Sequence, residues 1–219
     1  MKQYKKGFFI GISSLAIFTV WTLLLQCIDV QTAGVNGSAI GFAAANVRFH
    51  QLTGVHTSLY VVTDWLGLLP LLICLLFGGV GFVQLIRRRH FLAVDKDILL
   101  LGIYYIVIIF AYLFFEMVPI NYRPILIDGV MEASYPSSTT LLVLGVMPTV
   151  IFQIHRRAKR KSLQIIVDVL TAAFSLFMVI GRLIAGVHWW TDIVGAVWLS
   201  TGLFLLYLSA VGSADAKKR

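Results

Sequence analysis

Charged residues are scarce in this chain, where Asp, Glu, Lys and Arg make up only 13% of 219 residues. Hydrophobic residues make up 59%, and so little polar sequence cannot cover the surface of a soluble domain of this size. The scarcity therefore excludes a soluble globular protein. It favours membrane-spanning helices, each of which needs about 20 mostly apolar residues.

Cysteine is also rare, and other signals of metal or nucleotide chemistry are absent from the sequence. Cys27 and Cys74 each lie in an apolar segment without the spacing or neighbours of a metal site or a catalytic thiol. We interpret both as small buried apolar residues. The sequence has no P-loop glycine pattern and no Asp cluster with metal-ligand spacing. We therefore expect no metal and no cofactor.

Long hydrophobic runs, by contrast, are abundant. They predict an all-α fold, an integral membrane bundle of six transmembrane helices that forms a single domain over residues 1–219. No small-residue cleavage site follows the first run, so we expect this helix to be retained rather than removed as a signal peptide. The predicted spans are 7–29, 60–86, 97–120, 137–154, 162–185 and 190–211.

The net charge of +8 comes from topology signals and does not indicate a nucleic-acid partner. Fifteen of the 18 Lys and Arg residues lie in four clusters, within residues 2–6, 87–96, 156–161 and 217–219. With six spans, all four clusters fall on one side of the membrane. Because cytoplasmic loops collect Lys and Arg, we expect both termini to be cytoplasmic, with the basic runs beside membrane lipids.

Only Arg48, Arg123 and Arg182 remain for the outer side. Arg123 and Arg182 belong to short polar pieces at the ends of predicted spans, and a third such piece, 135–139, opens the fourth span. Because positive charge is scarce in outer loops, we expect these two arginines to have a specific role.

The polar pieces together can hold and attack a phosphate. The first turn of the fourth span offers free backbone N–H groups and the hydroxyls of Ser137 and Ser138 to an anion. Arg123 and Arg182 can each bind phosphate oxygens with two parallel hydrogen bonds. Taken singly, these features also fit an ordinary capped helix start and two arginines that reach lipid head groups.

His188 and Asp192 are four residues apart at the start of the sixth span, so they share one helix face. A carboxylate beside an imidazole fixes its tautomer and stabilises the cation that forms when the other ring nitrogen attacks. A hydrogen bond that serves only packing is the alternative interpretation. Convergence of three separate pieces on one side favours an oriented nucleophile with oxyanion contacts, as phosphoryl transfer requires.

These residues resemble the three motifs of the type 2 phosphatidic acid phosphatase family, the membrane relatives of vanadium haloperoxidases. Arg123-Pro124 matches the end of its first motif, and Pro136-Ser137 matches the start of its second. Arg182, His188 and Asp192 match the third motif with its full spacing. The resemblance implies that His188 forms a phosphohistidine, that Asp192 orients it, that the arginines and Ser137 hold phosphate, and that no metal is needed.

The chain departs from this family at two positions where a basic group is expected. The lysine of the first motif falls on Glu116, and the histidine of the second motif, which protonates the leaving oxygen, falls on Thr139. Loss of a general acid typically costs about 10²–10⁴ in rate. Three consequences are open: a leaving group that needs little help, a substitute acid at Glu116, His50 or His56, or binding without catalysis.

The sequence therefore predicts a membrane lipid phosphatase or phosphotransferase, with a phosphohistidine intermediate and a site at the outer face of a bacterial plasma membrane. A lipid phosphate or diphosphate is the expected substrate, and polyprenyl diphosphate carriers of envelope synthesis are among the candidates. The alternative is a catalytically weak relative that binds phospholipids or partner membrane proteins. A transporter is disfavoured, since no paired broken helices occur in corresponding halves.

Several local expectations accompany this reading. The outer loop 30–59 is expected to place a short amphipathic helix at the membrane surface, as a lid or entry ramp. Ser134 is expected to cap a helix that Pro136 opens, and Pro148 is expected to kink it. Asp168, within the fifth span and without an obvious basic partner in any span, is either a structural or a functional acid. Asp64 lies near the outer end of the second span.

Overall fold

The computed structural model describes residues 2–216, and in this range it contains helices and loops but no named strand. The only extended pairings in the range are isolated bridges within loops. The predicted all-α class is therefore confirmed. In chain order the elements are α1 (Lys2–Leu25), η1 (Val35–Gly37), α2 (Ala43–Thr53), α3 (Thr57–Leu66), α4 (Leu68–Arg88), η2 (Phe91–Ala93), α5 (Lys96–Met117), α6 (Ser138–Arg157), α7 (Lys161–Ile184) and α8 (Trp190–Ala216).

Six helical segments of the described chain are long and apolar enough to cross a membrane, as predicted. The second of them is built from α3 and α4 together, joined at Gly67. The first helix begins earlier than predicted, at Lys2. It also ends earlier, at Leu25, because the chain turns at Gln26 and reaches a left-handed backbone at Asp29 with φ of 46°. Apolar composition continues to Ile28, so hydropathy alone placed this boundary too late.

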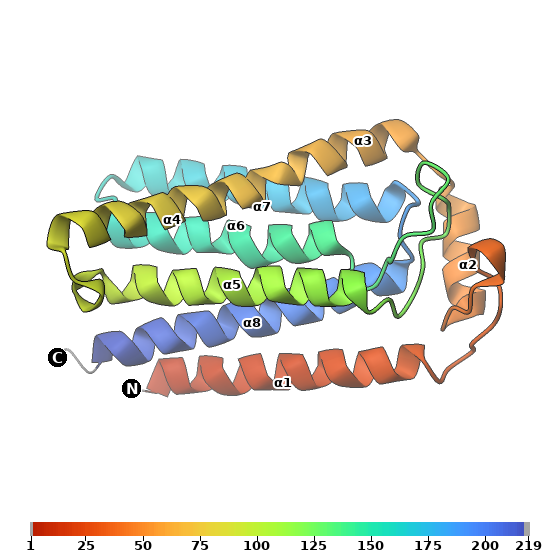
Figure 1. The fold of residues 1–219 in the computed structure, drawn as a ribbon, viewed down its shortest axis with the longest axis horizontal. Helices are drawn as coiled ribbons and strands as arrows, with labels where there is room; N and C mark the ends of the chain where they lie inside the picture. Colours follow the sequence, from red (N-terminus) through yellow and green to blue (C-terminus); the bar gives the residue numbers. More distant parts are fainter. Residues whose placement is uncertain (1, 217–219) are drawn as a thin grey trace.

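Helix α6 is the central element of the bundle. It contacts α4, α5, α7 and α8, and more of its apolar window is buried than in any other span of the described chain. Helix α1 packs along α8, and α3 lies beside α7 (Figure 1). Helices α1, α3, α4, α5 and α7 turn large apolar side chains outward, which is the arrangement expected of helices that face lipid.

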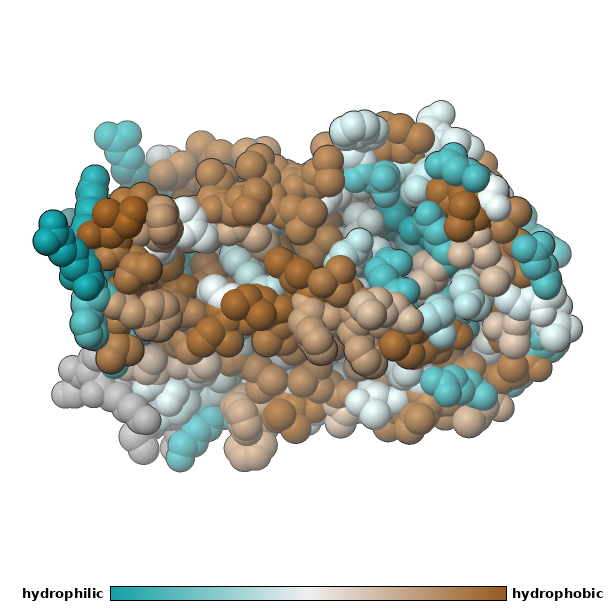
Figure 2. Space-filling model, in the orientation of Figure 1, coloured by the Kyte–Doolittle hydropathy of each residue, from teal (hydrophilic) through white to brown (hydrophobic). Residues whose placement is uncertain are grey.

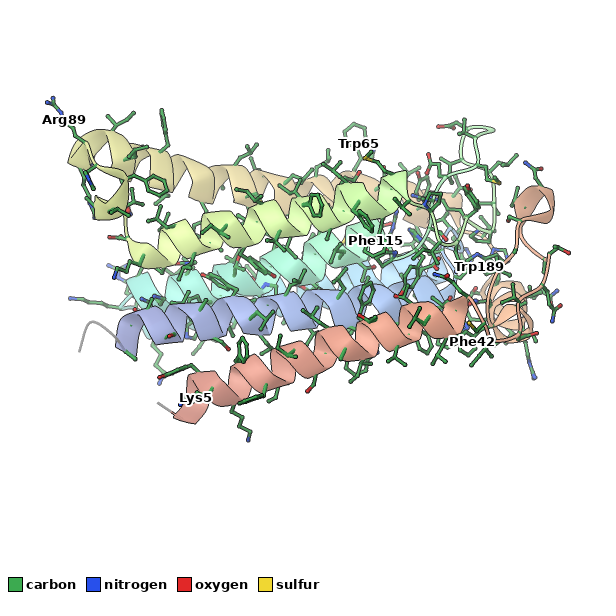
Figure 3. All side chains as sticks on the ribbon, turned by 60° about the horizontal axis from the view of Figure 1, so that its bottom comes forward. Lys5, Phe42, Trp65, Arg89, Phe115 and Trp189 are labelled. Atoms are coloured by element: carbon green, nitrogen blue, oxygen red, sulfur yellow. The ribbon has the colours of Figure 1, made fainter. Side chains whose placement is uncertain are left out.

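The two ends of the bundle differ in character. The described basic residues near the N-terminus, the α4–α5 loop and the α6–α7 loop gather at one end, where Lys5 and Arg89 lie (Figure 3). Trp189 lies at the opposite end, with α2 and the long loop before α6 (Figures 1 and 3). Between them the visible surface is a broad apolar belt (Figure 2). The basic clusters therefore share one end, as the span count predicted, while residues 217–219 lie outside the described range.

The start of α6 differs from the prediction. Ser137, not Ser134, is its N-cap, and the Ser137 hydroxyl oxygen accepts a hydrogen bond of 3.5 Å from the N–H of Thr140. The helix begins at Ser138, so Pro136 precedes the cap and does not open the first turn. Pro148 lies inside α6, which continues through it without interruption.

The aromatic ring of Tyr135 packs between α1, α5 and α8. Its side chain is buried, it stacks on Phe18 with centroids 6.1 Å apart, and its hydroxyl lies 2.7 Å from Thr22 Oγ1. Gly195 of α8 leaves the space for this ring, since a Cβ added at Gly195 would lie 2.5 Å from a Tyr135 ring carbon. A ring held on three sides cannot move away to admit that methyl group.

We therefore expect Gly195→Ala to lower the midpoint of thermal unfolding in detergent, because overpacking a filled core costs typically about 1–3 kcal/mol. Gly102→Ala in α5 is the matched control, since a Cβ there meets nothing within 4 Å. The control should be neutral or slightly stabilising, because Ala is the better helix former. Equal midpoints for the two variants would contradict the packing of Tyr135 against α8.

Candidate active site

The loop between α5 and α6 folds back on itself as a short hairpin. Asp128 and Gly129 form its tip with φ of 50° and 78°, the left-handed pair that a two-residue type I′ turn requires. The N–H and C=O groups of Ile127 and Val130 bond across this tip, and further along Tyr122 bridges to Ala133. An Asp-Gly pair thus returns the chain over the end of the bundle.

This hairpin positions Arg123. The backbone N–H of Arg123 donates to the carbonyl of Glu132 across the hairpin at 3.0 Å, and its Nε lies 3.1 Å from Glu132 Oε2. Its guanidinium is buried and lies over the ring of Tyr60, 5.9 Å from the centroid. Nη1 of Arg123 has no hydrogen-bond partner among the described residues.

Arg182, in the last turn of α7, is 1% exposed. Its guanidinium also lies over the Tyr60 ring, 5.1 Å from the centroid, so Tyr60 contacts both arginines. Nη1 of Arg182 lies 3.5 Å from Asp64 Oδ1, while its buried Nε has no partner in the described range. Buried N–H groups of a charged side chain are rarely left unpaired. The two arginines therefore present free donors where a ligand oxygen would complete the site.

His188 faces Arg182 with its Nε2 atom. The chain leaves α7 through Gly186, whose φ of 72° and close approach to Gly54 permit no side chain. His188 Nδ1 lies 3.1 Å from the carbonyl oxygen of Ser134, which only accepts, so Nδ1 carries the proton. The lone pair is then on Nε2, which lies 3.5 Å from Arg182 Nη2.

Asp192 is fully buried and lies behind the imidazole. Its Oδ2 accepts from the backbone N–H of Trp189 at 2.9 Å, which is half of a capping box for α8. Its Oδ1 accepts from Asn121 Nδ2 at 3.3 Å, and Oδ2 lies 3.7 Å from His188 Nδ1. The carboxylate is thus beside the histidine, but the direct hydrogen bond of Nδ1 goes to Ser134 instead.

The two serines of the predicted anion site are not equivalent. Ser137 is fully buried, its backbone N–H donates to the carbonyl of Asp192 at 3.1 Å, and its hydroxyl bonds to Thr140 Oγ1 at 3.1 Å. These bonds tie the start of α6 to the start of α8. Ser138 instead lines a small pocket together with Glu116, on the side of α6 that faces α5.

Thr139, at the position where the family has a histidine, lies beside the junction of α3 and α4. Thr139 is buried, and its methyl group packs where α3 meets α4: a Cβ added at Gly67 would lie 3.2 Å from Thr139 Cγ2 and 2.9 Å from the Asp64 carbonyl oxygen. Thr139 and Glu116 are therefore on different sides of the first turn of α6. Neither supplies a cation to the arginine pair.

The loop histidines and Asp168 take other roles. His50 Nε2 bonds to the Gly186 carbonyl at 3.0 Å, and His56 Nε2 bonds to the Thr53 carbonyl at 2.8 Å. Each therefore holds loop backbone. Asp168 does have a basic partner, contrary to the prediction, because His155 Nε2 lies 2.9 Å from its Oδ1 at the opposite end of the bundle.

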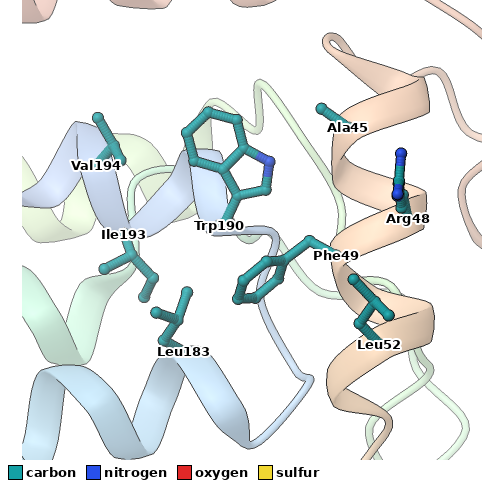
Figure 4. A pocket seen from close by; sticks show the side chains of 8 residues that line it. All are labelled: Ala45, Arg48, Phe49, Leu52, Leu183, Trp190, Ile193 and Val194. Atoms are coloured by element: carbon teal, nitrogen blue, oxygen red, sulfur yellow. The ribbon is translucent and has the colours of Figure 1, made fainter.

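The predicted short helix in the first loop is present as α2. Asn46, fully buried, anchors it by donating to the carbonyl of Gly41 and to Thr191 Oγ1 at 2.9 and 3.0 Å. Between α2 and the ends of α7 and α8 lies a pocket of about 440 Å³ (Figure 4). Its walls are apolar apart from Arg48, so this cavity suits a hydrocarbon and lacks the polar groups of the arginine site.

No group of three or more His, Cys, Asp and Glu side chains in the described residues could hold a metal ion. Two contributors to the site had not been singled out from the sequence, Tyr60 beneath the arginines and Asn121 on Asp192. Each is one polar residue beside an apolar run, so only the packing of distant segments reveals its role.

The fold and the site together define a polytopic helical membrane protein with two buried arginines and a buried histidine at one end of the bundle. The chain belongs to the PAP2 superfamily, whose family profile matches residues 100–215, more than half of the chain. This confirms the resemblance drawn from the motifs. Family membership supports a phosphatase in general.

A solved structure has the same fold. It is the first transmembrane PAP2 type phosphatidylglycerolphosphate phosphatase from Bacillus subtilis, with a TM-score of 0.63 and 17% sequence identity. The match covers 94% of this chain and 96% of that chain. No curated protein sequence matches this chain significantly.

His188 is held uncharged by its surroundings. Burial lowers its pKa well below the ordinary value, and the positive charges of Arg123 and Arg182 lower it further, while the Ser134 carbonyl opposes the shift. The unfolded chain takes up a proton at His188 below a pH of about 6.5. The folded chain does not, so the stability that this histidine provides is complete above that pH and is lost as the pH falls.

We accordingly expect the midpoint of thermal unfolding to fall between pH 7 and pH 5, and to fall less in His188→Asn. His56→Asn, at an exposed histidine, should retain the full dependence of the wild type. The measurement is thermal unfolding of the purified proteins at matched ionic strength. An unchanged pH dependence in His188→Asn would contradict a neutral His188.

Proposed function

We propose that this protein removes the terminal phosphate of a membrane lipid through a covalent phosphohistidine at His188. The observation that supports this most directly is the position of His188 Nε2. Its lone pair lies 3.5 Å from Arg182, beside two buried guanidinium groups that retain unpaired N–H donors. An uncharged nucleophile next to preorganised cationic donors is the arrangement that phosphoryl transfer uses.

The first step forms a bond between Nε2 and phosphorus and breaks the bond to the leaving oxygen, which departs with the electron pair. Arg123 and Arg182 bind the oxygens on which charge is concentrated. The imidazole becomes positive as it attacks, and the Asp192 carboxylate, 3.7 Å from Nδ1, stabilises that charge. Hydrolysis or transfer to another acceptor then removes the phosphoryl group.

A lipid diphosphate, such as a polyprenyl diphosphate, is the substrate we favour. Thr139 cannot protonate a leaving alkoxide, whereas a phosphate leaving group departs without added protonation. A monoester such as phosphatidylglycerol phosphate, which the structural neighbour's name indicates for that protein, demands more help from a general acid. The apolar pocket between α2 and α8 is suited to part of the hydrocarbon chain.

The site lies at the end of the bundle away from the basic clusters. By the rule that basic loops remain in the cytoplasm, this end faces outward in a plasma membrane, and both termini are cytoplasmic. An outward site fits lipid carriers that are recycled after envelope synthesis. No metal is required, because the arginines supply the positive charge.

A second function is favoured by Glu116 and Thr139. If these replacements abolish turnover, the same arginines bind phosphate-bearing lipids without cleaving them. The buried His188, whose Nε2 makes no strong bond to protein, argues against this alternative. A scaffold has no need of an uncharged nucleophile between two arginines.

Replacement of the nucleophile should separate these functions. We expect His188→Ala to reduce phosphate release more than about 10³-fold. The purified protein in detergent is assayed with phosphatidate, phosphatidylglycerol phosphate and a polyprenyl diphosphate. His56→Ala is the matched control and should retain wild-type release. Release that persists in a folded His188→Ala protein would exclude the histidine mechanism, and binding without release by the wild type would establish the second function.

Restoring the family histidine should broaden the substrate range. We expect Thr139→His to raise release from phosphatidate about 10-fold or more, because a general acid assists the poor alkoxide leaving group most. Release from the polyprenyl diphosphate should change little. An equal gain on both substrates would argue against leaving-group assistance as the reason that a diphosphate is preferred.

A further inference from the structure

From the position of Asp64 in α3, and resting on the proposed function, we infer that Asp64 is the general base that activates water to hydrolyse the phosphohistidine. In the family pattern a histidine stands at position 139, where this chain has Thr139. Asp64 would accept the proton of water in the second step, hydrolysis, in place of that histidine. The reaction has two steps, and a good leaving group removes the need for an acid only in the first. Water is a weak nucleophile, so the second step still needs a group that accepts its proton.

Asp64 and His188 approach the same guanidinium from two sides. Asp64 Oδ1 lies 3.5 Å from Nη1 of Arg182, and His188 Nε2 lies 3.5 Å from Nη2. If Arg182 binds a phosphoryl group on His188 Nε2, the Asp64 carboxylate lies at the other terminal nitrogen of the same guanidinium. In-line displacement requires the incoming water to approach phosphorus opposite Nε2, and in the proposed role Asp64 accepts the proton of that water.

Asp64 also shares a corner of the site with position 139. Gly67 donates its N–H to the Asp64 carbonyl at 3.0 Å, and the Thr139 methyl group packs against the same glycine. The first turn of α6 and the end of α3 thus meet where the family histidine would project. The Asp64 side chain therefore extends from a helix end that packs against position 139.

Exposure separates Asp64 from the other acids at this end of the bundle. The Asp64 side chain is 55% exposed near the outer end of its span, whereas Asp192 is fully buried and already accepts two hydrogen bonds. Glu132 is paired with Arg123 across the hairpin, and Glu116 lies in the separate pocket beside α5. Among the described carboxylates, Asp64 alone combines an ion pair with Arg182 and an exposed side chain.

The pairing of Asp64 with Arg182 does not block phosphate. Arg182 Nε and Arg123 Nη1 remain without partners, so phosphate oxygens have donors that Asp64 does not use. In hydrolysis a proton moves from water to the Asp64 carboxylate as the water oxygen bonds to phosphorus. The bond from Nε2 to phosphorus breaks, and its electron pair returns to the ring. Asp64 then loses its proton to solvent.

The test is to follow the two steps separately with a polyprenyl diphosphate labelled in its terminal phosphate. We expect Asp64→Asn to form acid-labile phosphoprotein at nearly the wild-type rate and to release phosphate about 10²-fold or more slowly. Labelled protein should therefore accumulate towards one phosphate per chain. Asp64→Glu, which keeps the carboxylate, should restore part of the release.

Two controls define the result. Asp168→Asn removes a carboxylate that pairs with His155 at the other end of the bundle, and it should behave as the wild type. His188→Ala should form no phosphoprotein in any background. The double variant of Asp64→Asn with Thr139→His should release phosphate faster than Asp64→Asn alone, because the restored histidine can act as the base.

The outcomes separate this inference from the proposed function. Wild-type rates of release in Asp64→Asn, with His188→Ala inactive, would overturn the role of Asp64 alone. Loss of phosphoprotein formation in Asp64→Asn would also overturn it, because the residue would then serve phosphate binding or structure. No release by the wild type from any substrate would overturn the proposed function and this role together.

Discussion

The pair of buried guanidinium groups over the ring of Tyr60 is the constraint on which the rest of this site depends. Two like charges in a medium of low dielectric repel each other and lose hydration, so they need compensation from nearby groups. Here the aromatic face lies beneath both, and Asp64 and Glu132 each neutralise one. The remaining unpaired N–H groups favour binding of an anion, since each buried donor without a hydrogen-bond partner costs about 1–3 kcal/mol.

The same charges explain the state of the histidine. A cation between two arginines is unfavourable, so the imidazole remains neutral with its proton on Nδ1. The scaffold enforces this orientation through backbone rather than side chains, because the Ser134 carbonyl holds Nδ1 and the Ser134 N–H is held by Asn121. The hairpin before α6 therefore positions both Arg123 and the tautomer of His188.

The two departures from the family pattern, Glu116 and Thr139, lie at different places in the structure. Glu116, near the end of α5, lines a separate small pocket together with Ser138. The Thr139 methyl group packs against Gly67, where the end of α3 meets α4, and the Asp64 carboxylate of α3 lies 3.5 Å from Arg182. The end of α5 and the first turn of α6 thus lack the basic groups of the family pattern, while Arg123, Arg182 and His188 are retained.

The sequence by itself determined the six spans and the common end of the basic clusters, and it predicted that His188, Asp192, Arg123 and Arg182 belong to one site. Hydropathy, loop charge and motif spacing are properties of the order of residues along the chain, so they are readable without coordinates. Tertiary structure alone decided that Ser134 rather than Asp192 bonds to Nδ1, that Ser137 caps α6, and that Tyr60 and Asp64 reach the arginines. Those contacts join segments far apart in sequence, and their partners are set by how the helices pack.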